Sequence, residues 1–261
     1  MRSLDNPLKK IENLPQKDRL EREFYDKEAE KYLRDFDEEL FLYDENEALP
    51  ISHQYFYSLL EEVRGKHVLD CCCGYGFTTV KCAKLGALVT GVDISPKMIE
   101  LAKKNAQFNQ VAQRVDLRVM SVEEMSFQNN TFDYAVGLGA LHHLNLTLCG
   151  REVSRVLKAG GKAIFLEPRI PFKGLIVLRS LVPVKCFESP GGAQLSDREV
   201  RQLTQYFSAF DAQYFLFLRK ISRLPFFNKF SVQLDRVDCY LLKKFPFLKS
   251  LYWAFVLEFT K

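Results

Sequence analysis

The segment from Lys66 to Ser95 constrains the fold more than any other, because two short apolar runs flank a glycine-containing turn. The first run ends at Asp70 and the second at Asp93, and the turn after the first contains Gly74 and Gly76. Parallel strands need a crossover helix, and the tight turn before that helix presents backbone N–H groups to a ligand. The segment therefore predicts a strand, a turn, a helix and a second parallel strand.

The spacing of the two aspartates indicates a nucleotide-like ligand. An acidic residue at the end of the second strand can accept hydrogen bonds from a ribose diol. Asp93 follows Asp70 by 23 residues, close to the offset of about 20 residues that is typical of a nucleotide-binding unit. The pattern suits a ligand of the adenosine type.

Strand-like and helix-like stretches continue to alternate beyond Asp93. Ser95 is a suitable N-cap and Pro96 a favourable first residue for the next helix. Further strands are predicted at 115–120, 134–138, 162–166, 210–218 and 251–260, and further helices at 146–157 and 196–207. This order predicts an α/β fold with a doubly wound, mostly parallel seven-stranded sheet, whose ligands lie outside the carboxyl ends of the strands.

We expect one integrated domain in three parts. Residues 1–64 form an arm and helices that cover the cofactor site, 65–168 form the cofactor-binding core, and 169–261 form a substrate lid or insertion with the last two strands. The apolar run 175–178 belongs to that lid, and 219–250 is expected to add helices beside the pocket.

Two helices are predicted before the core. From Lys17, apolar residues recur mainly at intervals of three and four, as in an amphipathic helix. A second helix begins at Pro50 and ends at Gly65. The family resemblance described below implies that Tyr25 and Tyr32 of the first helix are candidate lid residues, with aromatic core packing as the favoured alternative.

Charge and cysteine content exclude several classes of protein. The formal net charge of +4 is too small to indicate nucleic-acid binding by itself. Residues 219–261 contain nine Lys or Arg against three Asp or Glu, which we interpret first as a solvated basic face.

The seven cysteines lack paired C-x-x-C spacing, so reduced thiols and no metal are expected. Without an 18-residue apolar run or a signal-like start, a soluble, cytoplasmic protein is expected.

Four stretches together resemble a known family. They are VLDCCCGYG, GVDISPKMIELA, FDYAVGL with its LHHL exit, and VLKAGGKAIFLEP, in that order. Over residues 68–168 the chain resembles class I S-adenosylmethionine-dependent methyltransferases with a Rossmann-like fold, in particular the group that acts on quinone precursors, sugars and natural products. The resemblance implies S-adenosyl-L-methionine as cofactor and S-adenosyl-L-homocysteine as product.

The resemblance also implies which residues hold the cofactor. Gly74 and Gly76 approach the methionyl portion, Asp93 holds the ribose hydroxyls, and Ile94 and Met98 flank the adenine. The other residues assigned to the cofactor are Asp70, at the turn or the amino group, and Cys72, Ser121, Val122, Glu123 and Leu138.

Two positions depart from the family pattern. Cys72 stands where the family usually has its first glycine, and Ser121 where an acidic residue is frequent. A cysteine fits the first position if its backbone dihedrals are ordinary, and a serine can still hydrogen-bond adenine.

The implied reaction is direct displacement at the sulfonium methyl, without a covalent enzyme intermediate. His142 and His143 leave the fourth strand beside the expected methyl position, and histidine is a frequent general base. Either could instead be structural, and His143 is slightly preferred. Glu167 could orient a histidine, bind the substrate or pair with the loop. The exit loop lacks the N-P-P-Y pattern of several nucleic-acid and protein-amide methyltransferases, so a small, partly hydrophobic acceptor is favoured, at oxygen before carbon or nitrogen.

Alternatives remain open at the level of sequence. The basic C-terminal segment, with Lys243, Lys244 and Lys249, could serve an RNA methyltransferase, although nucleic acid is disfavoured as a partner. Cys72 and Ser121 could instead mark a non-catalytic subunit that keeps the cofactor fold. A weak membrane-surface contact through 217–230 could accompany methyl transfer. The expected assembly is a monomer or a homodimer.

Overall fold

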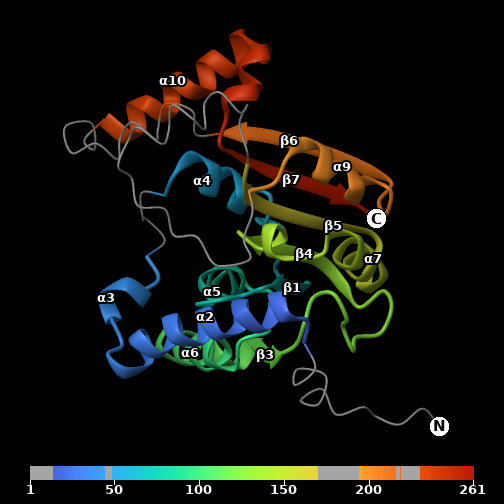
Figure 1. The fold of residues 1–261 in the computed structure, drawn as a ribbon. Coiled ribbons are helices and arrows are strands. Elements are labelled where there is room, and N and C mark those ends of the chain that lie inside the picture. The colour runs from blue at the N-terminus through green and yellow to red at the C-terminus, as the bar shows by residue number, and fades with distance from the viewer. Residues whose placement is uncertain (1–13, 45–48, 170–193, 216–217, 219–229) are drawn as a thin grey trace.

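A seven-stranded sheet forms the centre of the protein (Figure 1). The computed structural model describes residues 14–44, 49–169, 194–215, 218 and 230–261. The strand order is β3-β2-β1-β4-β5-β7-β6. The strands are β1 (His67–Cys71), β2 (Leu88–Asp93), β3 (Val115–Val119), β4 (Phe132–Leu138), β5 (Leu157–Pro168), β6 (Ala209–Phe215) and β7 (Ala254–Thr260). The predicted α/β fold with a mostly parallel sheet is confirmed.

The directions of the strands bring the predicted site residues to one edge. Strand β1 pairs in parallel with β2 and β4, β2 with β3, and β4 with β5. Only β7 runs against its neighbours β5 and β6. The carboxyl ends of five parallel strands therefore meet, and they carry Asp70, Asp93, Leu138 and Glu167.

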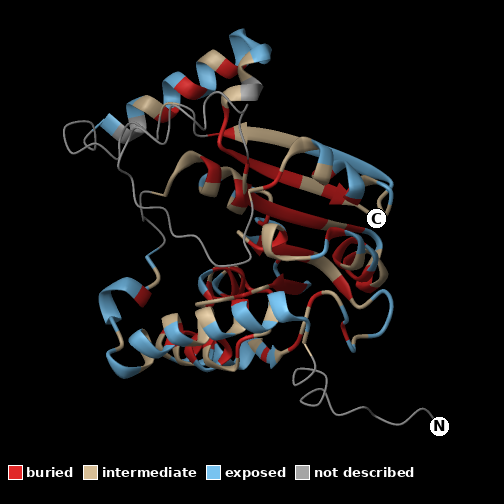
Figure 2. Cartoon of the chain, viewed as in Figure 1, coloured by how far each residue is buried: buried red, intermediate tan, exposed pale blue. Residues whose placement is uncertain are grey.

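Helices cover both faces of the sheet, whose central strands are buried (Figure 2). Helices α4 and α5 pack on one face through Phe56 and Val80, and α7 and α9 pack on the other through Cys149 and Leu203. The helices are α2 (Gln16–Arg34), α3 (Glu38–Phe41), α4 (Ile51–Ser58), α5 (Phe77–Lys84), α6 (Pro96–Phe108), α7 (Leu146–Val156), α9 (Asp197–Thr204) and α10 (Ser231–Lys244), with the 3-10 turns η1 (Ala112–Arg114), η2 (Leu141–His143) and η5 (Pro246–Leu251).

The predicted helix starts are confirmed, whereas two predicted ends are wrong: α9 ends at Thr204 rather than at Phe207, and α4 also ends early. The Ser95 hydroxyl accepts a hydrogen bond from the Met98 N–H at 3.0 Å, which caps α6. Ser196 and Glu199 form a capping box on α9. Helix α4 ends at Ser58 rather than at Gly65, because the Leu60 N–H bonds the Tyr57 carbonyl and tightens the chain into turns.

The C-terminal helix α10 lies at the β6 end of the sheet, far from α2 and α6 at the β3 end (Figure 1). The apolar run 175–178 of the predicted lid and most of 217–230 lie outside the described residues. Within the part of the chain that the structure describes, no helix is both long and apolar enough to cross a membrane.

Candidate functional site

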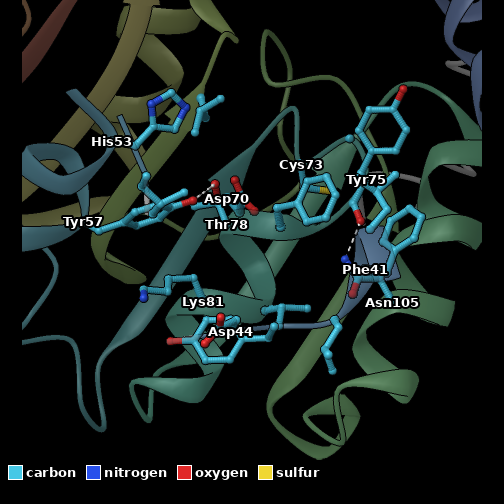
Figure 3. Close-up of a pocket in the computed structure, with 18 of the residues that line it drawn as sticks. Phe41, Asp44, His53, Tyr57, Asp70, Cys73, Tyr75, Thr78, Lys81 and Asn105 are labelled. Atoms are coloured by element: carbon cyan, nitrogen blue, oxygen red, sulfur yellow. Dashed lines mark hydrogen bonds between the residues drawn. The ribbon is translucent and has the colours of Figure 1, made fainter. Parts of the chain in front are cut away.

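Two adjoining cavities open at the carboxyl edge of the sheet. Cavity A, of about 270 Å³, lies between α2 and the ends of β2 and β4. Cavity B, of about 360 Å³, lies between the 40–44 segment, α4 and the start of α5 (Figure 3). Both are lined by Cys72, Gly74, Tyr75 and Leu138, so they meet at the ends of β1 and β4.

Cavity A gathers most of the residues assigned from sequence to the cofactor. Ile94 and the buried Met98 provide apolar walls, and the loop after β3 provides polar ones. The predicted residues that line this cavity are Cys72, Gly74, Asp93, Ile94, Met98, Ser121, Val122, Glu123, Leu138 and His143.

Asp93 is the most constrained acidic group of cavity A. Its side-chain oxygens accept hydrogen bonds from the N–H groups of Ser95 at 2.9 Å and Gly74 at 3.0 Å. Burial raises the pKa of this carboxyl to about 6, although the two backbone bonds and the nearby His143 lower it. A carboxylate has about four acceptor sites. After two backbone bonds, Asp93 keeps capacity for a pair of hydroxyl donors.

The turn between β1 and α5 needs its glycines for two reasons. Gly76 has φ +80°, and a Cβ there would lie 3.0 Å from the Ala102 Cβ, so its absence lets α5 and α6 approach. Gly74 has φ +49°, and an added Cβ would meet nothing closer than the Cys72 carbonyl oxygen at 4.0 Å. Gly74 therefore leaves open space where it lines both cavities, whereas Gly76 lines neither.

Cys72 corrects one expectation from the sequence. Its φ of +54° lies in the left-handed region, so the condition that this cysteine has ordinary dihedrals is not met. The family's glycine would adopt this conformation without strain. Burial raises the pKa of the Cys72 thiol well above its usual range, so the thiol is protonated and a poor nucleophile.

Asp70 lies at the junction toward cavity B. It is 1% exposed and accepts a hydrogen bond from the Thr79 hydroxyl at 2.6 Å. Burial raises the pKa of Asp70 to about 7, and the bond from Thr79 opposes that shift. This carboxyl is thus a buried acceptor that also lines cavity B.

Glu167 organises the loop that leaves β4. It is 1% exposed, and its Oε1 accepts hydrogen bonds from the N–H groups of Ala140 and Leu141, both at 2.7 Å. Its Oε2 lies 2.8 Å from His142 Nδ1. Through these bonds Glu167 holds the loop and the His142 ring in place. Neither Glu167 nor His142 lines cavity A or cavity B.

His143 joins the same loop to α2. Its Nε2 lies 3.2 Å from the Tyr25 hydroxyl, and its Nδ1 lies 3.4 Å from Glu21 Oε2. Lys17 Nζ donates to the His143 carbonyl oxygen at 2.7 Å. The His142 and His143 ring centroids are 3.9 Å apart. Helix α2 therefore covers cavity A through contacts that also fix the His143 ring.

The two candidate lid tyrosines differ. Tyr25 lines cavity A, whereas Tyr32 packs edge-on against Phe41 and Tyr75 in an aromatic cluster. Tyr32 is therefore a packing residue of the aromatic cluster, whereas Tyr25 lies over cavity A as expected of a lid residue.

Cavity B has a mixed lining of aromatic, aliphatic and polar side chains. Figure 3 shows Tyr57, Thr78 and Asp70 on one side of it, and Phe41 and Tyr75 on the other. The Tyr57 hydroxyl lies 3.5 Å from the Thr78 hydroxyl. The described residues of α10 line neither cavity A nor cavity B, in contrast to the expectation that 219–250 lies beside the pocket.

Comparison with known proteins agrees with this geometry. The methyltransferase domain family matches residues 69–165. The chain is 34% identical over 122 residues to sterol 4-C-methyltransferase strm-1 of Caenorhabditis elegans, covering 46% of this chain and 36% of that protein. It is 38% identical over 114 residues to demethylmenaquinone methyltransferase of Lactiplantibacillus plantarum, covering 42% and 48%.

Residues 69–165 thus match a methyltransferase domain. The chain spans less than half the length of these two curated relatives. Among solved structures, geranyl diphosphate C-methyltransferase from Streptomyces coelicolor has a TM-score of 0.63 at 13% identity, covering 94% of this chain and 98% of that one. Phosphoethanolamine N-methyltransferase 2 of Haemonchus contortus has a TM-score of 0.61 at 16% identity, covering 95% and 60%. These two likenesses show the fold.

Sequence reasoning missed three residues of this candidate site. Glu21 lines cavity A four residues before Tyr25, on the same helical face, and that spacing could have revealed it. Thr79 lies nine residues after its partner Asp70, and Tyr57 comes from a helix in a different part of the chain. No local pattern marks these last two.

Proposed function

We propose that this chain transfers a methyl group from S-adenosylmethionine to a small, partly hydrophobic metabolite. One observation carries the proposal: cavity A, with buried Asp93, joins cavity B at Gly74 and Leu138. One cavity can hold the cofactor while the other admits an acceptor. The similarity to curated methyltransferases supports transfer, and the activity of the whole protein rests on this proposal.

The residues of cavity A fit an adenosine-type cofactor. Asp93 has acceptor capacity for the ribose hydroxyls, Ile94 and Met98 offer apolar surfaces to the adenine, and Ser121 offers a hydroxyl. Gly74 leaves open space for the methionyl portion, and Asp70, a buried acceptor that lines cavity B, would hold its amino group where the two cavities meet. When bound, S-adenosylmethionine supplies an electrophilic methyl group.

The protein's own contribution is orientation and removal of a proton. Holding a nucleophile beside the methyl group can lower the barrier by roughly 7 to 11 kcal/mol. We propose His143 as general base, because it lines cavity A, whereas His142 does not. A Glu21 carboxylate facing Nδ1 favours the tautomer whose Nε2 carries the lone pair, and this nitrogen faces the Tyr25 hydroxyl.

The cover of cavity A also orients the proposed base. The Tyr25 hydroxyl and the Glu21 carboxylate, which face the two His143 ring nitrogens, both come from α2. Glu167 and His142 act as positioning residues, because Glu167 holds the loop and the His142 ring, and that ring lies 3.9 Å from the His143 ring between centroids. A general base contributes about 10²- to 10⁴-fold, which suits an acceptor hydroxyl.

The acceptor is proposed from cavity B. Its aromatic walls favour an apolar body, and the Tyr57 and Thr78 hydroxyls offer a few polar contacts. Oxygen is the proposed acceptor atom, with carbon and nitrogen as outcomes of the test.

The test is transfer of an isotopically labelled methyl group to metabolite extracts, followed by mass spectrometry of the labelled products. Labelled small molecules that disappear with the Asp93→Ala variant support the proposal. Label found only in RNA or protein, or no label despite measured cofactor binding, contradicts it.

A further inference from the structure

The outer surface of α10 and η5 gathers exposed apolar side chains. Among the described residues, twelve large apolar side chains are exposed, and five of them lie within 230–247. They are Phe230, Val237, Tyr240, Phe245 and Phe247, and Phe247 is 74% exposed. Figure 2 shows exposed segments along this helix, at the β6 end of the molecule. Such a cluster differs from single scattered apolar residues, because a contiguous patch marks a contact surface.

Basic side chains lie within the same surface. Val237, Tyr240 and Lys244 follow one another at intervals of three and four within α10, so they share one side of the helix. Phe247, in η5, packs edge-on against Phe245. Lys244 Nζ lies 5.6 Å from the ring centroids of both Tyr240 and Phe245, and it donates to the Tyr240 hydroxyl at 3.2 Å. Aromatic and cationic groups are therefore intermixed.

The charges of α10 are segregated by burial. Its two acidic residues, Asp235 and Asp238, are 4% and 2% exposed. Both oxygens of Asp238 accept hydrogen bonds from the Leu218 N–H, at 2.9 and 2.8 Å. Arg236, Lys243 and Lys244 are exposed. The solvent-facing charges of this helix are thus all positive.

We propose that this α10–η5 surface docks on a membrane that contains anionic lipid. Aromatic rings suit the headgroup region, and exposed Lys and Arg are attracted to an anionic leaflet. Helix α10 has 14 residues and carries charges, so it would lie in the interface. The surface shares only Phe230 with the 217–230 segment indicated by the sequence. The inference goes beyond methyl transfer because docking needs neither cofactor nor acceptor.

The α10–η5 surface lies at a distance from the cover of cavity A. Helix α10 lies at the β6 end of the sheet, whereas α2, which covers cavity A, lies at the β3 end (Figure 1). A membrane at α10 therefore lies away from α2 and cavity A.

The test is co-sedimentation of the full chain with phosphatidylcholine vesicles, with and without phosphatidylserine. We expect binding only to the anionic vesicles, and weaker binding as salt is raised. The double variant Lys243→Gln and Lys244→Gln should bind about 30-fold more weakly, at about fivefold per lysine. Phe247→Ser should also weaken binding, through the apolar contribution.

The matched control is Lys27→Gln with Lys103→Gln, which removes the same charge from exposed positions on α2 and α6. This control should bind vesicles nearly as well as the parent chain, and equal melting temperatures would show that all variants are folded. Absent vesicle binding, equal binding to neutral vesicles, or an equal loss in the control would overturn the proposal. Binding of single-stranded RNA, or self-association through this surface, in place of vesicle binding would also overturn it.

Discussion

The backbone conformation at Cys72 predicts an unusual order of stability among its variants. At φ +54° a residue with a Cβ is strained, and the left-handed conformation costs roughly 1 to 2 kcal/mol for L-residues. Cys72→Ala keeps that strain, whereas Cys72→Gly releases it. Glycine also loses more chain entropy on folding, by about 0.5 to 1 kcal/mol relative to alanine. The glycine variant should therefore be more stable than the alanine variant, by up to about 1.5 kcal/mol.

Cys71 provides the matched control. It is buried in strand β1, where φ is ordinary, so Cys71→Ala should be more stable than Cys71→Gly. The assay is urea unfolding of the four variants without ligand, with midpoints compared at equal slope. Both substitutions at one position remove the same thiol, so most of the lost packing cancels. If alanine is more stable than glycine at both positions, the left-handed strain at Cys72 is refuted.

Three further predictions concern the site. His143→Ala should lower kcat by about 10²- to 10⁴-fold with little change in cofactor affinity by calorimetry; unchanged kcat removes it from the role of base. Glu167→Gln should lower kcat less than His143→Ala does, and it should leave S-adenosylhomocysteine binding unchanged, because the amide oxygen can still accept the loop N–H bonds. A loss of S-adenosylhomocysteine affinity as large as the loss of kcat would contradict the positioning role. Since the pKa of Asp93 is about 6 and ribose hydroxyls bind its ionised form, S-adenosylhomocysteine should bind about tenfold more weakly at pH 5 than above pH 7, and a curve of unchanged slope in Asp93→Asn would contradict this assignment.

The sequence predicted those parts of the site that follow from strand ends. Asp93 ends β2, and Ile94 and Met98 come within five residues of it. Parallel strands bring their carboxyl ends to one edge, so cavity A could be anticipated. Leu138 ends β4 in the same way, and the histidines follow it. These positions depend on chain direction and local pattern, which a sequence contains.

Other features depend on packing between distant segments, which the sequence does not reveal. The contacts of His143 with Tyr25 and Glu21 join residues more than one hundred positions apart. The left-handed Cys72 could not be inferred, because most cysteines have negative φ. The helix end at Ser58 was also missed, since the glycine at position 65 suggested a later stop.

The central claim is that cavity A holds S-adenosylmethionine through Asp93. Isothermal calorimetry with S-adenosylhomocysteine tests it most directly, comparing the parent chain with Asp93→Ala and with Lys103→Gln, an exposed site outside both cavities. We predict one binding site in the parent and control chains, and at least about tenfold weaker binding for Asp93→Ala because charge-assisted hydrogen bonds are lost. Folded parent protein that binds neither S-adenosylhomocysteine nor S-adenosylmethionine, or equal affinity in Asp93→Ala, would contradict the claim.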